Sequence, residues 1–404
     1  MYLWKENLVA SKTFVDVSVY MASCLSLPSL HCPRSRLQVR VSMSCVSGRK
    51  TPYLVGPAAT GFHSSSSTLQ PSKPYRSLNA QAAIPILAKA LSTAIVTQVT
   101  KGNWSRLSSL SLPSCRLNPQ ALSILSQGDW PLLRVLELSD NCLDAEGVAL
   151  LAKGEWPSLR QIDFSCNPDI DAVAIAQLSA ADWPLEVLKL CSMPICAATA
   201  AELAKLQLPR MRTVALHNTG LTAAGMSKLV RANWARLSWL DLSVNDLDAV
   251  AMQHLCWMHL PALKGLGVRR TNLAQEEAYW LALGRWPSLT TLNLSDNHLD
   301  AKAAEHIASG VWPRLQVLSL DGNSFGHAGL QQLTKGNWPL LHDLRIGLEM
   351  LEIRHSSVCL GLDPDMVQAF RLGTGHNGEI LNLDREVSRA VGLWPELNNI
   401  LIVG

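Results

Sequence analysis

Residues 130–155 read WPLLRVLELSDNCLDAEGVALLAKGE, and variants of this stretch recur through the middle of the chain. With Trp130 counted as position 1, leucines stand at positions 4, 7, 9 and 14, and Asn141 stands at position 12. Positions 7 and 9 enclose a polar residue, which is the period-2 pattern of a short strand with one buried face. The first half of the stretch therefore predicts a strand.

The second half of the stretch has helical spacing instead. Positions 19 and 22 are apolar, as in Val148 and Leu151, and an i, i+3 apolar pair is the buried stripe of a short helix. Gly154 follows and suits a helix C-terminus. The proline after the next tryptophan stops the helix and turns the chain back. Each unit is thus predicted to be strand, turn, helix and turn.

A tryptophan, usually followed by proline, marks the start of each unit. The marks are spaced 26, 26, 27, 25, 26, 26, 26, 26 and 26 residues apart, and two of them are leucines. They are Trp104, Trp130, Trp156, Trp183, Leu208, Trp234, Leu260, Trp286, Trp312 and Trp338. A fixed period between 20 and 50 residues predicts a solenoid of stacked units that bury their leucines against one another. The tryptophans are interpreted as packing wedges between coils, since each buried ring hides about 150–250 Å².

The pattern L-x-x-L-x-L-x-x-N-x-L resembles the leucine-rich repeat superfamily, and the helical half of each unit is similar to its ribonuclease-inhibitor-like class. The resemblance implies an α/β solenoid shaped like a horseshoe, with parallel strands on the concave face and short helices on the convex face. It also implies that the position-12 side chain bonds to neighbouring backbone, a role that Asn141 fits and Met193 does not. One residue is missing before Leu185, so we expect an irregular coil after Trp183.

The chain divides into four expected segments. They are a disordered, low-complexity Ser/Pro/Arg-rich segment over 1–77, an N-terminal capping helix within 78–103, a repeat domain of about nine to ten repeats over 104–346, and an irregular segment over 347–404 with a partial repeat at 394–402. The first segment is interpreted as an unstructured tail, an organelle transit peptide or a mistranslated gene start, because Val17 to Gly128 contain no Asp or Glu. The partial repeat would end the chain on an exposed strand edge that favours further repeats or self-association.

Composition excludes several classes of function. A net charge of +3 is too small to argue for nucleic acid, and no 18-residue uncharged apolar run predicts a membrane span. The ten cysteines form no C-x-x-C pair, which favours reduced thiols and an intracellular, cytoplasmic location, with an organelle as the alternative. No H-E-x-x-H, Walker loop or G-x-S-x-G occurs, so we expect no catalysis, cofactor or metal.

The concave face is the expected binding surface, because solenoids commonly bind partners there. In the family, positions 6, 8 and 10 project from the inner strands. Trp239 beside Arg269 has the composition of a binding hot spot, although packing of the ring and pairing of the arginine with Asp241 or Asp296 is the alternative for each residue. The candidate partner-binding residues are Glu137, Asp163, Lys189, His217, Trp239, Asp241, Arg269, Arg270, Asn293 and Asp321.

The expected function is that of a non-catalytic scaffold that holds a protein partner on this face. Two alternatives stay open. One is a substrate-recognition or regulatory subunit of the ubiquitin-ligase or immune-receptor type, which needs an effector domain that residues 1–77 do not show. The other is catalytic help to a small GTPase, as similar solenoids give in the Ran GTPase-activating proteins, for which no residue here can be matched.

Overall fold

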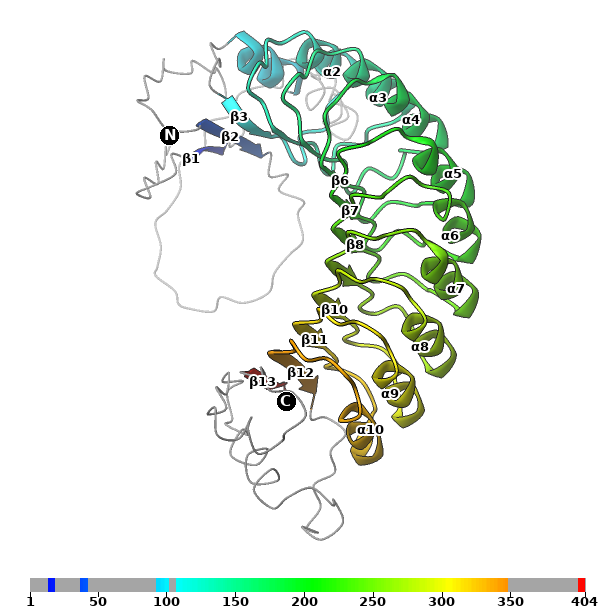
Figure 1. The fold of residues 1–404 in the computed structure, drawn as a ribbon. Coiled ribbons are helices and arrows are strands. Elements are labelled where there is room, and N and C mark those ends of the chain that lie inside the picture. Colours follow the sequence, from blue (N-terminus) through cyan, green and yellow to red (C-terminus); the bar gives the residue numbers. More distant parts are fainter. Residues whose placement is uncertain (1–13, 19–36, 43–91, 102–106, 348–398, 404) are drawn as a thin grey trace, which may run out of the picture.

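The computed structural model describes residues 14–18, 37–42, 92–101, 107–347 and 399–403. Within these residues, one parallel sheet of 13 strands runs in sequence order from β1 to β13. The sheet lines the inner arc of a horseshoe and the helices line its outer arc (Figure 1). The predicted α/β solenoid, with strands on the concave face and helices on the convex face, is confirmed.

The central strands are short and equally spaced. They are β3 (Leu107–Ser111), β4 (Val135–Glu137), β5 (Gln161–Asp163), β6 (Val187–Lys189), β7 (Thr213–Ala215), β8 (Trp239–Asp241), β9 (Gly265–Gly267), β10 (Thr291–Asn293), β11 (Val317–Ser319) and β12 (Asp343–Gly347). Each covers positions 6 to 8 of its unit, so position 7 points into the core and positions 6 and 8 point to the concave face.

The helices occupy the second half of each unit. They are α2 (Pro119–Ser126), α3 (Ala145–Ala152), α4 (Ala172–Gln177) with the 3-10 turn η1 (Leu178–Ala180), α5 (Ala197–Lys205), α6 (Ala223–Leu229), α7 (Ala249–Trp257), α8 (Gln275–Ala282), α9 (Ala301–Ala308) and α10 (Gly326–Leu333). Several begin at an aspartate whose carboxylate accepts a backbone N–H of the first turn, as Asp144 does from Gly147 at 2.9 Å.

The irregular coil expected after Trp183 affects only the convex side. An extra residue lies in the turn between Asn167 and Ile170, and one residue is missing between Trp183 and Leu185. The two changes cancel before the next strand, so β5 pairs with β6 in the same 26-residue register as elsewhere (Gln161↔Val187). The shortened α4 and the turn η1 lie between these two changes.

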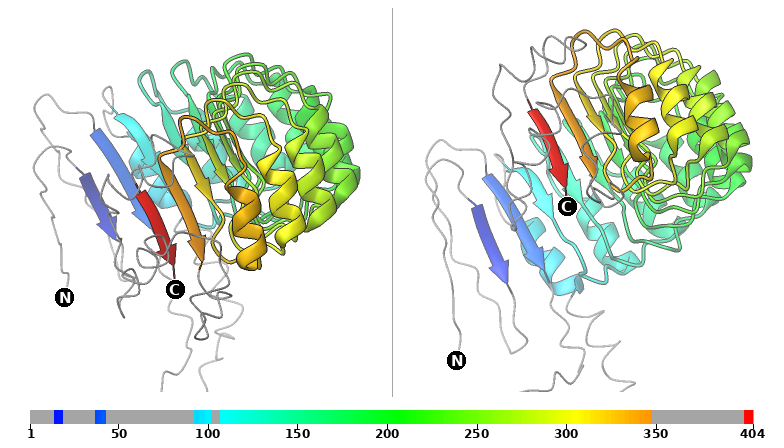
Figure 2. Two further views of the ribbon diagram at one scale, coloured as in Figure 1. Left: turned by 60° about the horizontal axis from the view of Figure 1, so that its bottom comes forward. Right: turned by 90° about the horizontal axis from the view of Figure 1, so that it is seen from below.

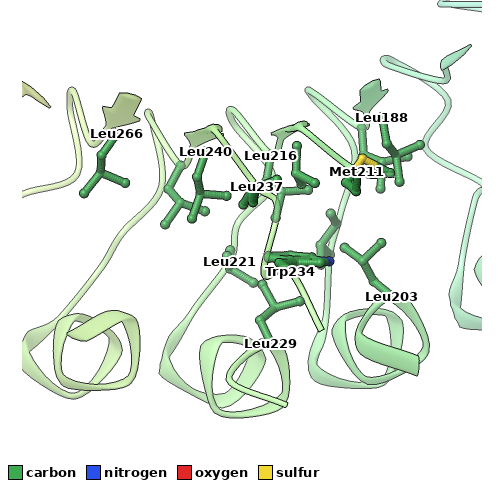
Figure 3. Packing of buried hydrophobic residues seen from close by; sticks show 14 of the residues in the cluster. Leu188, Leu203, Met211, Leu216, Leu221, Leu229, Trp234, Leu237, Leu240 and Leu266 are labelled. Carbon is green, nitrogen blue, oxygen red and sulfur yellow. The ribbon is translucent and has the colours of Figure 1, made fainter. Parts of the chain in front are cut away.

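A continuous core runs between the sheet and the helices. Figure 3 shows the ring of Trp234 between Leu229 on α6, the helix that precedes it, and Leu203 on α5, one repeat earlier, with Leu237 nearby. Burial of such rings is worth roughly 4–6 kcal/mol each before conformational entropy is counted. The position-1 tryptophans from Trp130 to Trp338 are therefore the wedges between coils that the sequence predicted, and Trp104 lies outside the described residues.

The glycine that precedes several of these tryptophans has a different role from the predicted one. A Cβ at Gly310 would lie 2.6 Å from Cη2 of Trp312, and one at Gly154 would lie 2.5 Å from Nε1 of Trp156. Neither glycine adopts the positive φ that favours glycine as a helix cap. The glycines are needed because the indole two residues later fills the space of a side chain.

The position-12 asparagines connect neighbouring coils as the resemblance implied. Asn141 accepts the backbone N–H of Cys115 at 2.8 Å, and its amide donates to the carbonyl of Leu112 at 2.7 Å. Asn141 in turn donates its own N–H to Asn167 Oδ1 at 2.8 Å. At the next position 12, Met193 contributes a buried apolar side chain instead.

The ends of the chain differ in part from the expectation. Within the segment expected to be disordered, the strands β1 (Phe14–Ser18) and β2 (Leu37–Ser42) pair in parallel, and β2 continues onto β3. Both strands alternate apolar and polar residues, a local pattern that the Ser/Pro/Arg-rich composition of the whole segment concealed. The remainder of 1–77, and with it the transit-peptide interpretation, lies outside the described residues.

The other two expected segments are described only in part. A helix covers residues 92–101 and buries Ile95, Val96 and Val99 against the core, whereas residues 78–91 are not described. β13 (Asn399–Val403) pairs with β12 at the far end of the sheet, and Ile400 lies opposite Leu344. Residues 348–398 lie outside the described part. Within the described residues, no helix is long and apolar enough to cross a membrane.

Candidate protein-binding face

The middle of the concave face carries one large exposed aromatic side chain, Trp239 on β8. Its neighbours at position 6 of the adjoining strands are Thr213 on β7 and Gly265 on β9. A Cβ at Gly265 would fall on the indole ring, which shows that the ring lies across the bare backbone of β9. The residue is still 42% exposed. One face of the indole is therefore held against the sheet while the other is open to a partner.

Asp241 stands beside Trp239 on the same strand and is held in a similar way. A Cβ at Gly267 would lie 2.8 Å from Oδ1 of Asp241, so this carboxylate also leans over β9. The same oxygen accepts the backbone N–H of Ser243 at 3.0 Å. Because Gly265 and Gly267 have no side chains, the indole of Trp239 and the carboxylate of Asp241 can both lie over the backbone of β9. This part of the face therefore presents an apolar group and an acidic group side by side.

The early coils carry an area of neighbouring acidic side chains. Glu137 on β4 accepts a hydrogen bond from Ser111 at 2.7 Å, and Asp163 on β5 pairs with Lys189 on β6 at 3.4 Å. Asp140 accepts a hydrogen bond from Ser114 at 2.6 Å. The acidic groups lie on adjacent coils, and the cation of Lys189 partly neutralises them.

The two arginines one coil beyond Asp241 are directed elsewhere. The guanidinium of Arg269 lies 2.5 Å from Oδ2 of Asp296, and Arg270 approaches the same oxygen at 3.4 Å. Arg270 has a φ of 53°, the left-handed conformation that also occurs at Asp296. Both arginines therefore pair with Asp296, which for Arg269 is the alternative to direct partner contact. Both also remain well exposed on the rim.

The remaining candidates lie along the same arc. Asn293 on β10 accepts the backbone N–H of Ser295 at 3.1 Å, and Asp321 accepts the hydroxyl of Ser295 at 2.7 Å. His217 follows β7 and is half-buried, and its carbonyl accepts the N–H of Ser192. These residues line the face without forming a single compact cluster with Trp239.

One half-buried thiol, Cys191, lies just after β6. The pKa of Cys191 is raised, first by burial and also by the nearby carboxylates of Asp163 and Asp241. Hydrogen bonds with His217 and Ser165 act in the opposite direction. The thiol is therefore kept in its neutral form and contributes packing to the face, not reactivity.

The glycines of β9 are the residues that sequence reasoning missed. Gly265 and Gly267 occupy positions 6 and 8, where the other coils have residues such as Thr291 and Asn293. Two glycines in one strand mark a place where another group approaches the backbone closely. The signal that could have revealed this contact is the pair of glycines at positions 6 and 8 of one coil, which is seen when these positions are compared between neighbouring coils.

Two further observations bound the chemistry of the described residues. No group of three or more His, Cys, Asp or Glu side chains in them is arranged to hold a metal ion. The basic and acidic groups of the face are engaged mostly with one another or with backbone amides, as described for Asp163, Asp241 and Arg269.

A match to a family model supports the repeat assignment. A family model described as Leucine Rich repeat matches residues 131–152 and 287–308. A search of curated proteins gave no match. A solved structure titled as a TLR13-ssRNA13 complex is 19% identical, with a TM-score of 0.35, and the match covers 61% of this chain. The matched part spans 38% of the TLR13 chain.

Proposed function

Since the chain is a leucine-rich repeat protein, we propose that it is a non-catalytic scaffold that binds a protein partner on its concave face, with Trp239 as the central contact. The observation that carries the proposal is the exposed indole of Trp239 held against the backbone of Gly265. A large aromatic side chain that is already oriented loses little conformational entropy on binding, and such residues dominate protein interfaces.

The surroundings of Trp239 define the chemistry of the partner. The indole needs an apolar side chain above it, and the adjoining Asp241 needs a cation or a hydrogen-bond donor. Small residues, Thr213 and Ala215 on β7, leave room on one side of this pair. The proposed partner therefore presents an apolar side chain next to a Lys or Arg, and this pair enters the arc at β7 to β9.

The test uses an exposed tyrosine on the convex side of the molecule as a matched control. Trp239→Ala and Tyr279→Ala each remove one exposed aromatic side chain, the first from the concave face and the second from α8 on the convex side. Proteins that co-purify with the full chain from native extract are quantified for both variants after thermal melting shows that each is folded.

We expect at least one partner to be lost with Trp239→Ala and retained with Tyr279→Ala, since truncation of such a hot spot costs about 2 kcal/mol or more. Asp241→Ala should weaken the same partner. A set of partners that is unchanged by Trp239→Ala would contradict the proposal, because the central contact would then contribute nothing to binding.

A further inference from the structure

The turns that lead from each helix into the next strand line one edge of the solenoid, at the tails of the strand arrows (Figure 2). We call the later part of it the basic edge. It comprises the turns from the end of α5 to the start of β12, which are residues 205–212, 230–238, 257–264, 283–290, 309–316 and 334–342. These turns contain nine Lys and Arg residues and no Asp or Glu.

The three turns that follow α2, α3 and η1 on the same edge have a different charge. Acidic residues occur in each of them, namely Asp129, Glu155, and Asp182 with Glu186. Arg160 pairs with Glu186 there, so positive charge is locally neutralised. The absence of acid from α5 onward is thus a property of the later coils and not of the repeat.

The arginines of the basic edge have little internal compensation. Arg212 reaches Glu186 at 3.6 Å, and Lys205 pairs with Glu202 at 2.7 Å. Five exposed arginines make no ion pair with any described residue. They are Arg210, Arg231, Arg236, Arg285 and Arg314. Like charges gathered in this way raise the local potential and attract an anionic partner.

Exposed apolar side chains lie among these arginines. Trp257 at the end of α7 is 57% exposed, Leu283 one repeat later is 47% exposed, and Val311 before β11 is 76% exposed. The indole of Trp257 makes an edge contact with His254, with ring centroids 5.6 Å apart. Apolar side chains on three successive coils, bordered by charge, are typical of a protein-binding surface.

We infer that the basic edge is a second docking surface, and that it takes an acidic protein segment with apolar side chains between its Asp and Glu residues. The charge requires an anionic partner. The aliphatic side chains of Leu283 and Val311 favour a polypeptide over a nucleic acid, since phosphates and sugars would leave them uncovered. The surface is separate from the concave face, and the inference does not depend on the proposed role of Trp239.

The repeat geometry sets the length of this segment. Neighbouring helices pack roughly 8–10 Å apart, so Arg231 and Arg285, which lie two coils apart, are separated by roughly 20 Å. An extended peptide of about six residues, or a helix of about 13 residues, covers that span. Trp257 lies on the coil between the two arginines, which places an apolar contact in the middle of the segment.

The experiment measures binding of a defined peptide to the full chain by fluorescence anisotropy. The probe is a fluorescein-labelled 20-residue peptide of Glu, Asp, Leu and Phe, and a second probe has Ser in place of every Leu and Phe. The test variant is Arg231→Glu/Arg285→Glu. The matched control is Arg134→Glu/Lys153→Glu, which makes the same change of charge on the same edge in the early coils.

We expect the first probe to bind the wild type and the control equally, and the test variant about tenfold more weakly or worse. Trp257→Ala should weaken binding about fivefold, the Ser probe should bind more weakly than the first, and added salt should weaken all binding. Trp239→Ala should bind the probe like the wild type, which separates this surface from the concave one.

Three results would overturn the inference. The first is equal binding by the test variant and the control, which would remove the basic edge as the site. The second is equal affinity for the two probes, which would remove the apolar contact. The third is tighter, edge-dependent binding of a 20-nucleotide single-stranded RNA than of the acidic peptide, which would assign the edge to nucleic acid. None of these outcomes bears on the concave face.

Discussion

Two kinds of coil occur in this solenoid, and they fill the same space differently. In the coils of Trp286 and Trp312, the residue two positions before the tryptophan is glycine, Gly284 and Gly310. In the two coils whose mark is leucine, the same position holds a large side chain, Leu206 before Leu208 and Met258 before Leu260. Leu206, Met258 and Leu260 are buried, and Leu208 is partly buried.

The difference shows that the period is a rule about volume and not about tryptophan. A tryptophan with a glycine two positions before it fills about the same space between sheet and helix as a leucine with a large side chain two positions before it. Interiors are packed close to crystalline density, so the two positions must change together. Trp183 and Trp234, which follow Ala181 and Ala232, lie between these extremes.

The largest expected effect comes from removing the ring alone. Trp286→Ala should lower the free energy of unfolding by about 3–5 kcal/mol, because a cavity stays between two coils. Leu260→Ala in a leucine coil should cost less, since Met258 still fills part of the space. Urea denaturation followed by circular dichroism measures both. A larger loss of stability for Leu260→Ala than for Trp286→Ala would contradict the volume argument.

Filling the space beside the ring is the next largest change. Gly284→Ala should destabilise by about 1–3 kcal/mol, because the added methyl group falls on the indole of Trp286. The control is Ala232→Gly in the coil of Trp234, which removes a methyl group that is already accommodated and should cost about 0.5–1 kcal/mol through the backbone alone. The same urea experiment tests the pair, and a neutral Gly284→Ala would contradict the volume argument.

Conversion of a leucine coil into a tryptophan coil tests whether the two positions act together. Leu260→Trp alone should overpack the coil and destabilise it. Met258→Gly/Leu260→Trp should be more stable than the sum of the two single changes, with a coupling of about 0.5–3 kcal/mol. A double-mutant cycle from urea midpoints gives this coupling. Additive effects would show that the two side chains do not share one space.

The same residues show which parts of the fold and of the candidate site the sequence can predict. The recurring Trp130-type stretch predicts the solenoid, because local periodicity and stacking determine the fold of a repeat protein. The prediction that Gly154 serves as a helix cap was wrong, since its contact with Trp156 depends on a ring orientation that spacing does not specify. Trp239 was predicted as a candidate, but its contact with the backbone of Gly265 was missed because Gly265 belongs to a neighbouring coil.

The orientation of the ring gives a smaller contrast, between the early and late tryptophan coils. Trp130 donates its indole N–H to the carbonyl of Leu125 at 2.8 Å, whereas the buried N–H of Trp312 has no partner among the described residues. Phenylalanine removes the N–H in both cases. Trp130→Phe should therefore cost about 1 kcal/mol more than Trp312→Phe, as measured by urea denaturation. Equal costs would show that the hydrogen bond adds nothing.

The smallest expected effect is a difference in reactivity between two thiols. They are Cys196 at the start of α5 and Cys256 near the end of α7, the helices that precede the leucine coils. The pKa of Cys196 is lowered by a hydrogen bond with Thr199 and by backbone N–H groups of the first turn of α5. Burial at the end of α7 raises the pKa of Cys256. Since the thiolate is the reactive form, iodoacetamide at pH 7.5 should modify Cys196 faster than Cys256, as followed by mass spectrometry.

The same two thiols report on packing in the coil of Leu260. Thr199→Val should slow modification of Cys196, because the thiolate loses its hydrogen bond, and should leave Cys256 unchanged. Met258→Gly removes the side chain that fills the leucine coil next to Cys256, so it should speed modification of Cys256 and leave Cys196 unchanged. If Met258→Gly left Cys256 as slow as before, the large side chain before Leu260 would not be what closes that coil.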